Sequence, residues 1–97
     1  RYRLIMSTIF NAIGCRVEVE KMIATGRIDM VVQTTNYIYV FELKLSNNGG
    51  IDAATEQIRA KQYAEPFKAD KRKVVALAIE LDENGKGVVD WKEAILS

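Results

Sequence analysis

The sequence contains no histidine and only one cysteine, Cys15. Without histidine the chain cannot supply a Ser-His-Asp or Cys-His nucleophile, an imidazole general base or a histidine-bearing zinc site. One cysteine forms no disulfide within the chain and cannot hold structural zinc alone. Any metal that this chain binds is therefore expected to be a hard cation such as Mg²⁺ or Mn²⁺, held by carboxylate oxygens.

Long apolar runs and a surplus of charge are also missing. No segment approaches the roughly 20 apolar residues of a membrane-spanning helix, and no signal-peptide pattern is present, so we expect a cytoplasmic protein without a membrane partner. The formal net charge of +1 neither requires nor excludes a polyanion. Residues 1–97 are expected to form one domain. They begin inside a helical pattern without methionine, so we expect a fragment of a longer protein.

Hydrophobic periodicity predicts an α/β domain with the order α-β-β-β-α-β and a short extra edge strand. Ile5, Met6, Ile9, Phe10 and Ile13 are expected to share the buried face of the first helix. Trp91 is expected to close the core. The predicted elements are a helix over 2–13, strands over 15–22, 27–34 and 37–45, a helix over 51–63, a strand over 73–81 and the edge strand around Val88 and Val89.

Two connections predict how these strands pair. Thr35-Asn36 is short enough for a tight hairpin, so the second and third strands should be antiparallel, with Asp29 opposite Glu42. A helix between the third and fourth strands implies a right-handed crossover and parallel pairing. The result is a mixed sheet flanked by helices.

Three charged residues interrupt otherwise apolar strands. Glu42 and Lys44 share a strand face with Ile38 and Val40, and Asp29 lies between two apolar neighbours. Strands pair at about 4.8 Å, which would bring the carboxylates of Asp29 and Glu42 within reach of one cation. Two converging carboxylates repel each other unless a divalent cation such as Mg²⁺ neutralises them.

A plainer interpretation of the same residues stays open. Glu42 and Lys44 could form a partly exposed ion pair at a wet strand end. Asp29 could accept hydrogen bonds from the Gly26-Arg27 turn. The tripeptide Glu-x-Lys is too common to decide between these interpretations by itself.

Three segments together are more specific than any one of them. The segments 26–32 (GRIDMVV), 37–45 (YIYVFELKL) and 54–67, with Gln57, Lys61, Tyr63 and the ending Ala-Glu-Pro-Phe, resemble the PD-(D/E)XK nuclease superfamily. The chain is most similar to a bacterial branch in which this domain lies C-terminal to an AAA-type ATPase-like region. The resemblance implies a restriction-endonuclease-like fold and a partner region upstream in the same protein.

The same resemblance implies roles for individual residues. Asp29 and Glu42 would hold Mg²⁺ or Mn²⁺, and Lys44 would position the attacking water and stabilise charge on the phosphate. Glu20 matches an acidic position of this branch and would be a third acid at the metal, directly or through water. The sequence departs from the family pattern in having Ile28 in place of proline and no acidic residue between positions 1 and 14.

Substrate-binding residues are less sharply indicated. Gln57 and Lys61 lie one helical turn apart, and the resemblance places Gln57, with Lys61 or Tyr63, near phosphate or a base. Arg27 could meet a phosphate. An ordinary solvated helix face and a surface arginine explain these residues equally well. The basic cluster Lys68, Lys71, Arg72 and Lys73 could follow a DNA backbone, but basic clusters before a buried strand are more often solubilising edges.

Two functions follow as hypotheses. The first is a Mg²⁺-dependent nuclease that hydrolyses phosphodiester bonds in DNA, as a monomer or a homodimer. The alternative is a nuclease-like module without activity that serves as a binding or regulatory part of its ATPase-like partner region. A remote third option is an unrelated α/β interaction domain, in which Asp29 and Glu42 would lie apart.

Overall fold

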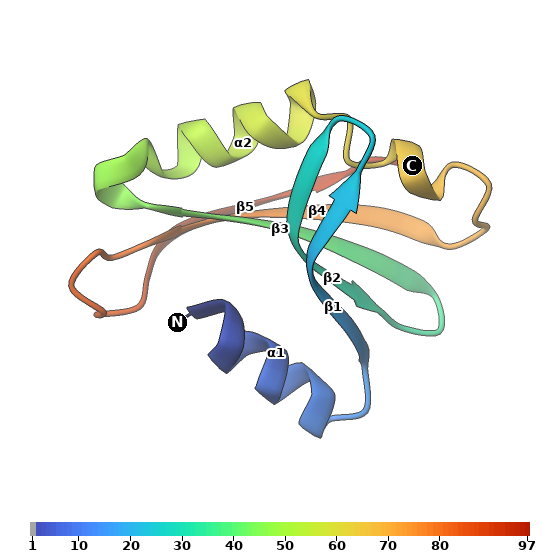
Figure 1. Ribbon diagram of the computed structural model, residues 1–97, viewed down its shortest axis with the longest axis horizontal. Helices are drawn as coiled ribbons and strands as arrows, with labels where there is room; N and C mark the ends of the chain where they lie inside the picture. The colour runs from blue at the N-terminus through green and yellow to red at the C-terminus, as the bar shows by residue number, and fades with distance from the viewer. Residues whose placement is uncertain (1) are drawn as a thin grey trace.

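The computed structural model describes residues 2–97 as a five-stranded mixed sheet between two helices (Figure 1). No helix within these residues has the length and apolarity needed to cross a membrane. In chain order the elements are α1 (Tyr2–Ala12), β1 (Arg16–Ile23), β2 (Gly26–Gln33), β3 (Tyr37–Leu45), the 3₁₀ turn η1 (Ser46–Asn48), α2 (Gly50–Ala60), the 3₁₀ turn η2 (Glu65–Phe67), β4 (Lys73–Leu81) and β5 (Val88–Ile95).

The sheet has the strand order β1-β2-β3-β4-β5. The pairs β1·β2, β2·β3 and β4·β5 are antiparallel, whereas β3 and β4, which α2 connects, are parallel. The predicted order of elements and the mixed sheet are thus confirmed. The register of the β2–β3 hairpin, with Met30 opposite Phe41 and Gln33 opposite Ile38, is also the predicted one. Thr34 closes its turn by donating its N–H to the carbonyl of Tyr37 at 2.9 Å.

The alternation of side chains along the strands divides the core into two clusters, one on each face of the sheet. The first cluster lies against α2 and includes Ile38 and Val40. The second includes Phe41, and Phe10 of α1 packs against it with the two rings 5.9 Å apart. Tyr39 also packs against this cluster, whereas Tyr37, at the start of β3, is 40% exposed.

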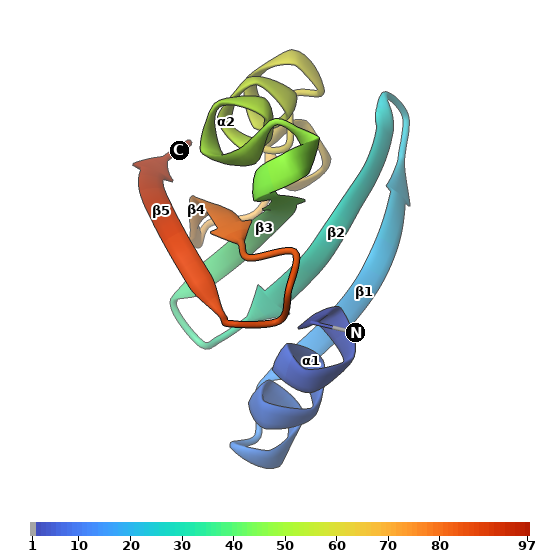
Figure 2. The same cartoon turned by 90° about the vertical axis from the view of Figure 1, so that its left-hand side faces the viewer.

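Two expectations about the periphery are wrong. The last strand is not short, because β5 has eight residues, and Trp91 does not close the core, because it is 60% exposed. The physical reason is visible in Figure 2: β5 is the edge strand farthest from β1, and α1 packs mainly on β1 and β2 at the other side of the sheet. The face of β5 that carries Trp91 is left open within the described residues.

The row of partly buried side chains on α1 is also narrower than the periodicity predicts. Tyr2, Met6 and Phe10, each four residues apart, contact the core. Ile5, Ile9 and Ile13 are 45%, 56% and 69% exposed. A helix that lies over only two strands at the edge of a sheet buries a single row of side chains, so the expected wider apolar face is not used.

Candidate active site

Asp29 and Glu42 come together at the point where the β2–β3 ladder ends. They are the next residues beyond the last paired positions, Met30 and Phe41. The Asp29 side chain replaces a main-chain partner there, because its Oδ2 accepts a hydrogen bond from the backbone N–H of Leu43 at 2.8 Å. The two carboxylates therefore lie side by side at an opening in the sheet, with Asp29 6% and Glu42 2% exposed.

Burial dominates the electrostatics of Glu42. Removal from water raises the pKa of its carboxyl group from an ordinary 4.5 to about 7. A hydrogen bond from Tyr63 opposes the rise in pKa, whereas the charge of Asp29 and a hydrogen bond with its carboxyl group add to it. Lys44 has a smaller lowering effect on the pKa, with its Nζ 3.8 Å from Glu42 Oε2. A buried carboxylate with so little compensation is an unusual feature outside functional sites.

Tyr63 fixes the orientation of Glu42. Its side chain is fully buried, and its hydroxyl lies 2.5 Å from Glu42 Oε1 and 3.1 Å from the carbonyl of Arg27. A hydroxyl has one proton, and the nearer, charged acceptor is the stronger partner. Gln57 of α2 donates its Nε2 hydrogen to the same hydroxyl at 3.0 Å. Burial, followed by the hydrogen bond to Glu42, raises the pKa of Tyr63 well above its ordinary value, so it stays a donor.

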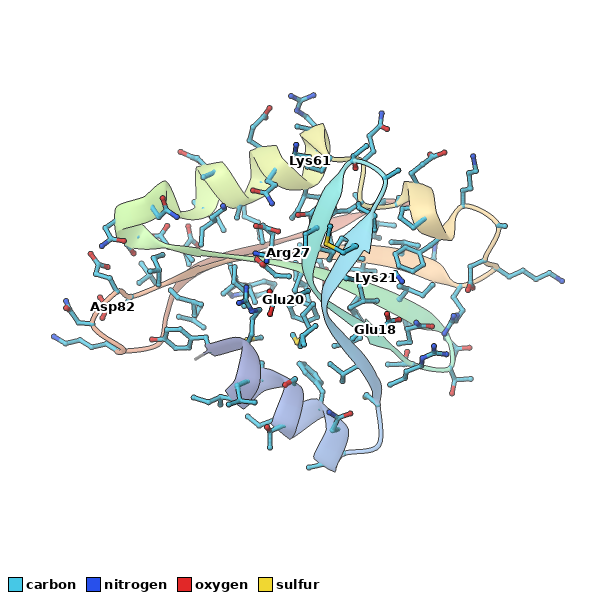
Figure 3. All side chains as sticks on the ribbon, in the orientation of Figure 1. Glu18, Glu20, Lys21, Arg27, Lys61 and Asp82 are labelled. Carbon is cyan, nitrogen blue, oxygen red and sulfur yellow. The ribbon has the colours of Figure 1, made fainter. Side chains whose placement is uncertain are left out.

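Glu20 lies on β1 at the position opposite Asp29 of β2, where the β1–β2 ladder is interrupted. Val19 pairs with Met30 and Lys21 with Ile28, while Glu20 between them has a φ of +52°, in the left-handed region. A residue other than glycine in this region is strained and marks a local constraint. The Glu20 side chain is turned to Arg27, whose Nη1 is 2.9 Å from Glu20 Oε1, and Figure 3 shows these two residues between α1 and α2.

Arg3 joins Glu20 to Asp29. Its Nη1 donates to Asp29 Oδ1 at 3.2 Å, and its Nη2 lies 3.7 Å from Glu20 Oε2. Arg3 was not among the predicted site residues, because the family pattern has an acid, and not an arginine, in the first helix. A signal was present, since Arg3 is the only charged residue between positions 2 and 15. A lone charge in an otherwise uncharged amphipathic helix is a candidate for a specific partner.

An open cleft of about 580 Å³ lies beside these residues; Arg3 lines it, but Glu20 does not. Of the residues singled out in the sequence, Asp29, Glu42, Lys44, Arg27 and Gln57 line it. Lys61 is not among the residues that line this cleft. Its alkyl chain lies beside Gly26 at the β1–β2 turn, and Figure 3 shows it at the end of α2. Tyr63 acts from behind, through its hydrogen bond to Glu42.

The basic cluster Lys68, Lys71, Arg72 and Lys73 is a separate feature. Lys68 pairs with Glu65 at 2.8 Å, and Arg72 pairs with Asp70 at the same distance while donating to the side chain of Gln33 and the carbonyl of Thr34. Arg72 thus ties the loop before β4 to the β2–β3 hairpin. The cluster is not part of the cleft lining.

The donor atoms at the cleft fit a hard cation. Asp29 and Glu42 present only oxygen, the ligand type that Mg²⁺ and Mn²⁺ prefer. A cation there would also offset the charge repulsion and burial that raise the pKa of Glu42. Within residues 2–97, however, no group of three or more His, Cys, Asp or Glu side chains is placed to hold a metal ion. Glu20 is held by the two arginines instead.

Fold and site together have the form of a restriction-endonuclease-like α/β domain, with an acid on each of two adjacent strands and a lysine two residues after the second acid. A family model of the PD-(D/E)XK nuclease superfamily matches residues 1–91. The chain belongs to this superfamily, as its motifs suggested.

One curated relative extends this result. The chain is 30% identical over 90 residues to the "Uncharacterized protein in vnfD 5′region" of Azotobacter chroococcum mcd 1. The match covers 93% of this chain but 17% of that relative. The relative is therefore a much longer protein that carries a similar domain.

Proposed function

We propose that this chain is a metal-dependent nuclease domain that hydrolyses phosphodiester bonds in DNA. The observation that carries the proposal is the pairing of Asp29 with the buried Glu42 at an opening of the sheet, with Lys44 beside them. Membership of a superfamily whose members are generally nucleases supports it. Asp29 and Glu42 would hold Mg²⁺ or Mn²⁺, with Glu20 as a further acid through water.

The contacts of each residue in the cleft indicate its role in the proposed reaction. A bound Mg²⁺ would supply Lewis-acid chemistry for phosphoryl transfer. Lys44 presents an ammonium group at the cleft that can donate hydrogen bonds to an attacking water and offset negative charge on the phosphate. Tyr63 and Gln57 keep Glu42 in one orientation, which leaves its Oε2 to the cleft side, near Lys44. Arg27 and Gln57 line the cleft where a nucleotide would lie.

Titration with Mn²⁺ tests the metal assignment. We expect the wild-type chain to bind Mn²⁺ at pH 8 in isothermal calorimetry and Glu42→Gln to lose most of this binding, because the amide keeps the shape but not the charge. Glu83→Gln, in the exposed turn after β4, is the matched control and should bind as wild type does. No binding by the wild-type chain, or equal binding by Glu42→Gln, would sink the assignment.

A catalytically inactive binding or regulatory module is the second candidate function. It is favoured by the contact of Arg3 with Asp29 and by the absence, within residues 2–97, of a third carboxylate beside Asp29 and Glu42. Cleavage assays on single-stranded, duplex and branched DNA with Mg²⁺ and Mn²⁺ separate the two candidates. An ATPase-like region as partner, a homodimer and a cytoplasmic location stay predictions.

A further inference from the structure

The contacts around the cleft join six charged side chains into one group. Arg27 contacts Glu20, Glu20 contacts Arg3, and Arg3 contacts Asp29. Asp29 lies beside Glu42, and Glu42 contacts Lys44. This charge cluster consists of Arg3, Arg27 and Lys44 on the positive side and Glu20, Asp29 and Glu42 on the negative side.

The formal charges of the cluster balance when no cation is bound. A phosphodiester carries a negative charge and gains little from a neutral surface. A divalent cation on Asp29 and Glu42 adds two positive charges at the same place, so the cluster then attracts an anion. The cation also competes with Arg3 for Asp29, because the cation and Arg3 Nη1 both bind the oxygens of the Asp29 carboxylate.

Arg3 is well placed for such an exchange. Its side chain is 36% exposed, and it borders the cleft together with Arg27, Asp29 and Lys44. Guanidinium groups bind phosphate oxygens through two parallel hydrogen bonds as readily as they bind carboxylates. The longer contact to Glu20, at 3.7 Å, does not involve Asp29, so it can persist when the shorter contact to Asp29 is lost.

We propose that Arg3 is a phosphodiester-binding residue. Without a cation it pairs with Asp29 and Glu20, and a divalent cation that binds Asp29 releases it to contact a phosphodiester. Nucleic-acid binding is then coupled to cation binding, with Glu20 as the residue that positions Arg3 and Arg27. This inference rests on the proposed function, because the cation it requires is the one assigned to Asp29 and Glu42.

The test compares Arg3→Gln with Arg16→Gln. Arg16 is an exposed arginine at the far end of β1, opposite Gln33, so its loss removes the same charge away from the cleft. Binding of a short fluorescein-labelled DNA duplex is measured by anisotropy, with EDTA and with Ca²⁺ to limit cleavage, over a series of salt concentrations. Mn²⁺ affinity is measured by calorimetry on the same proteins.

For the wild-type chain we expect Ca²⁺ to tighten duplex binding. Arg3→Gln should weaken duplex binding in Ca²⁺ by about tenfold and lower the salt slope by about one. Its Mn²⁺ affinity should be equal to or higher than that of the wild type, because a competitor for Asp29 is gone. Arg16→Gln should match the wild-type Ca²⁺ effect and Mn²⁺ affinity.

Three results would overturn the assignment of Arg3. The first is that Arg3→Gln binds the duplex in Ca²⁺ as tightly as the wild type does. The second is a lowered Mn²⁺ affinity of Arg3→Gln, which would indicate a structural role for Arg3. The third is that the wild-type chain does not bind the duplex. The metal assignment in the proposed function is judged separately, by Mn²⁺ binding of the wild type and of Glu42→Gln. Failure of Arg3 alone would leave that comparison intact.

Discussion

Glu42 is the residue whose environment differs most from that of an ordinary strand residue. It is 2% exposed, holds a hydrogen bond from Tyr63 and has a neighbouring carboxylate, and burial raises its pKa to about 7. Such a group costs stability when it is ionised without a counter-charge. A bound cation would supply the missing counter-charge, so a cation site accounts for this loss of stability.

This cost can be measured as a dependence of stability on pH. Glu42 loses its proton near pH 4.5 in the unfolded chain and near pH 7 in the folded chain. Between these values the folded state holds the additional proton, so this group lowers the free energy of unfolding as the pH rises from 4.5 to 7. Glu42→Gln does not titrate and keeps an oxygen that accepts from Tyr63.

In urea denaturation with EDTA, Glu42→Gln should therefore gain stability relative to the wild type between pH 4.5 and pH 8, by up to about 3 kcal/mol. Mn²⁺ at pH 8 should reverse the order, because only the wild type gains from the cation. A difference between the two proteins that is constant with pH would contradict the raised pKa of Glu42.

At the scale of elements, the start of α2 is set by a contact with β4. Glu80 Oε1 accepts the N–H of Ile51 at 2.9 Å, and Glu80 Oε2 accepts the hydroxyl of Ser46 at 2.6 Å. These two donors, the Ser46 hydroxyl first, hold the pKa of Glu80 below its ordinary value. An acceptor for a free N–H and a negative charge at a helix N-terminus are both favourable. This contact joins α2 to the strand parallel to β3.

Gly50 is required for this junction. Its φ is +58°, and a Cβ there would lie 2.5 Å from Glu80 Oε1. We expect Gly50→Ala to lower the free energy of unfolding by about 3 kcal/mol, from backbone strain and displacement of Glu80. Gly85→Ala is the control: its φ is +81°, but nothing lies within 4 Å of the added Cβ, so about 1 kcal/mol is expected. If chemical denaturation gave the same loss of unfolding free energy for Gly50→Ala and Gly85→Ala, the contact with Glu80 would not contribute to the effect at Gly50.

At the scale of the whole molecule, the sheet is covered unevenly. The helix α2 packs on β3, β4 and β5, whereas α1 packs mainly on β1 and β2. Large apolar side chains are consequently exposed on the outer side of α1 and along β5, among them Ile9, Ile13, Trp91 and Ile95. Within the described residues the domain thus has an open edge along β5, and the outer side of α1 is also uncovered.

Trp91 reports on this open edge, because it is the only tryptophan in the sequence. At 60% exposure its fluorescence in the 97-residue chain should resemble that of free tryptophan, be quenched efficiently by acrylamide and shift little on unfolding. A blue-shifted, protected emission at micromolar concentration would contradict the exposure of Trp91. Dilution would show whether self-association produces the protection.

The sequence by itself determined the order of the elements, the register of the β2–β3 hairpin and the adjacency of Asp29 and Glu42. These features follow from local rules: side chains alternate along a strand, and the Thr35-Asn36 turn fixes which residues of β2 and β3 are opposite each other. The Asp29 and Glu42 positions therefore needed no knowledge of the rest of the chain.

Only the tertiary structure decided which distant residues complete the site. The hydrogen bond of Tyr63 to Glu42 spans 21 positions, and the contact of Arg3 with Asp29 spans 26. Such contacts depend on where each helix lies across the sheet, and periodicity specifies only which face of a helix is apolar. The placement of α1 over β1 and β2 brought Arg3 to the cleft and left Trp91 exposed, because a helix of 11 residues covers only part of a five-stranded sheet.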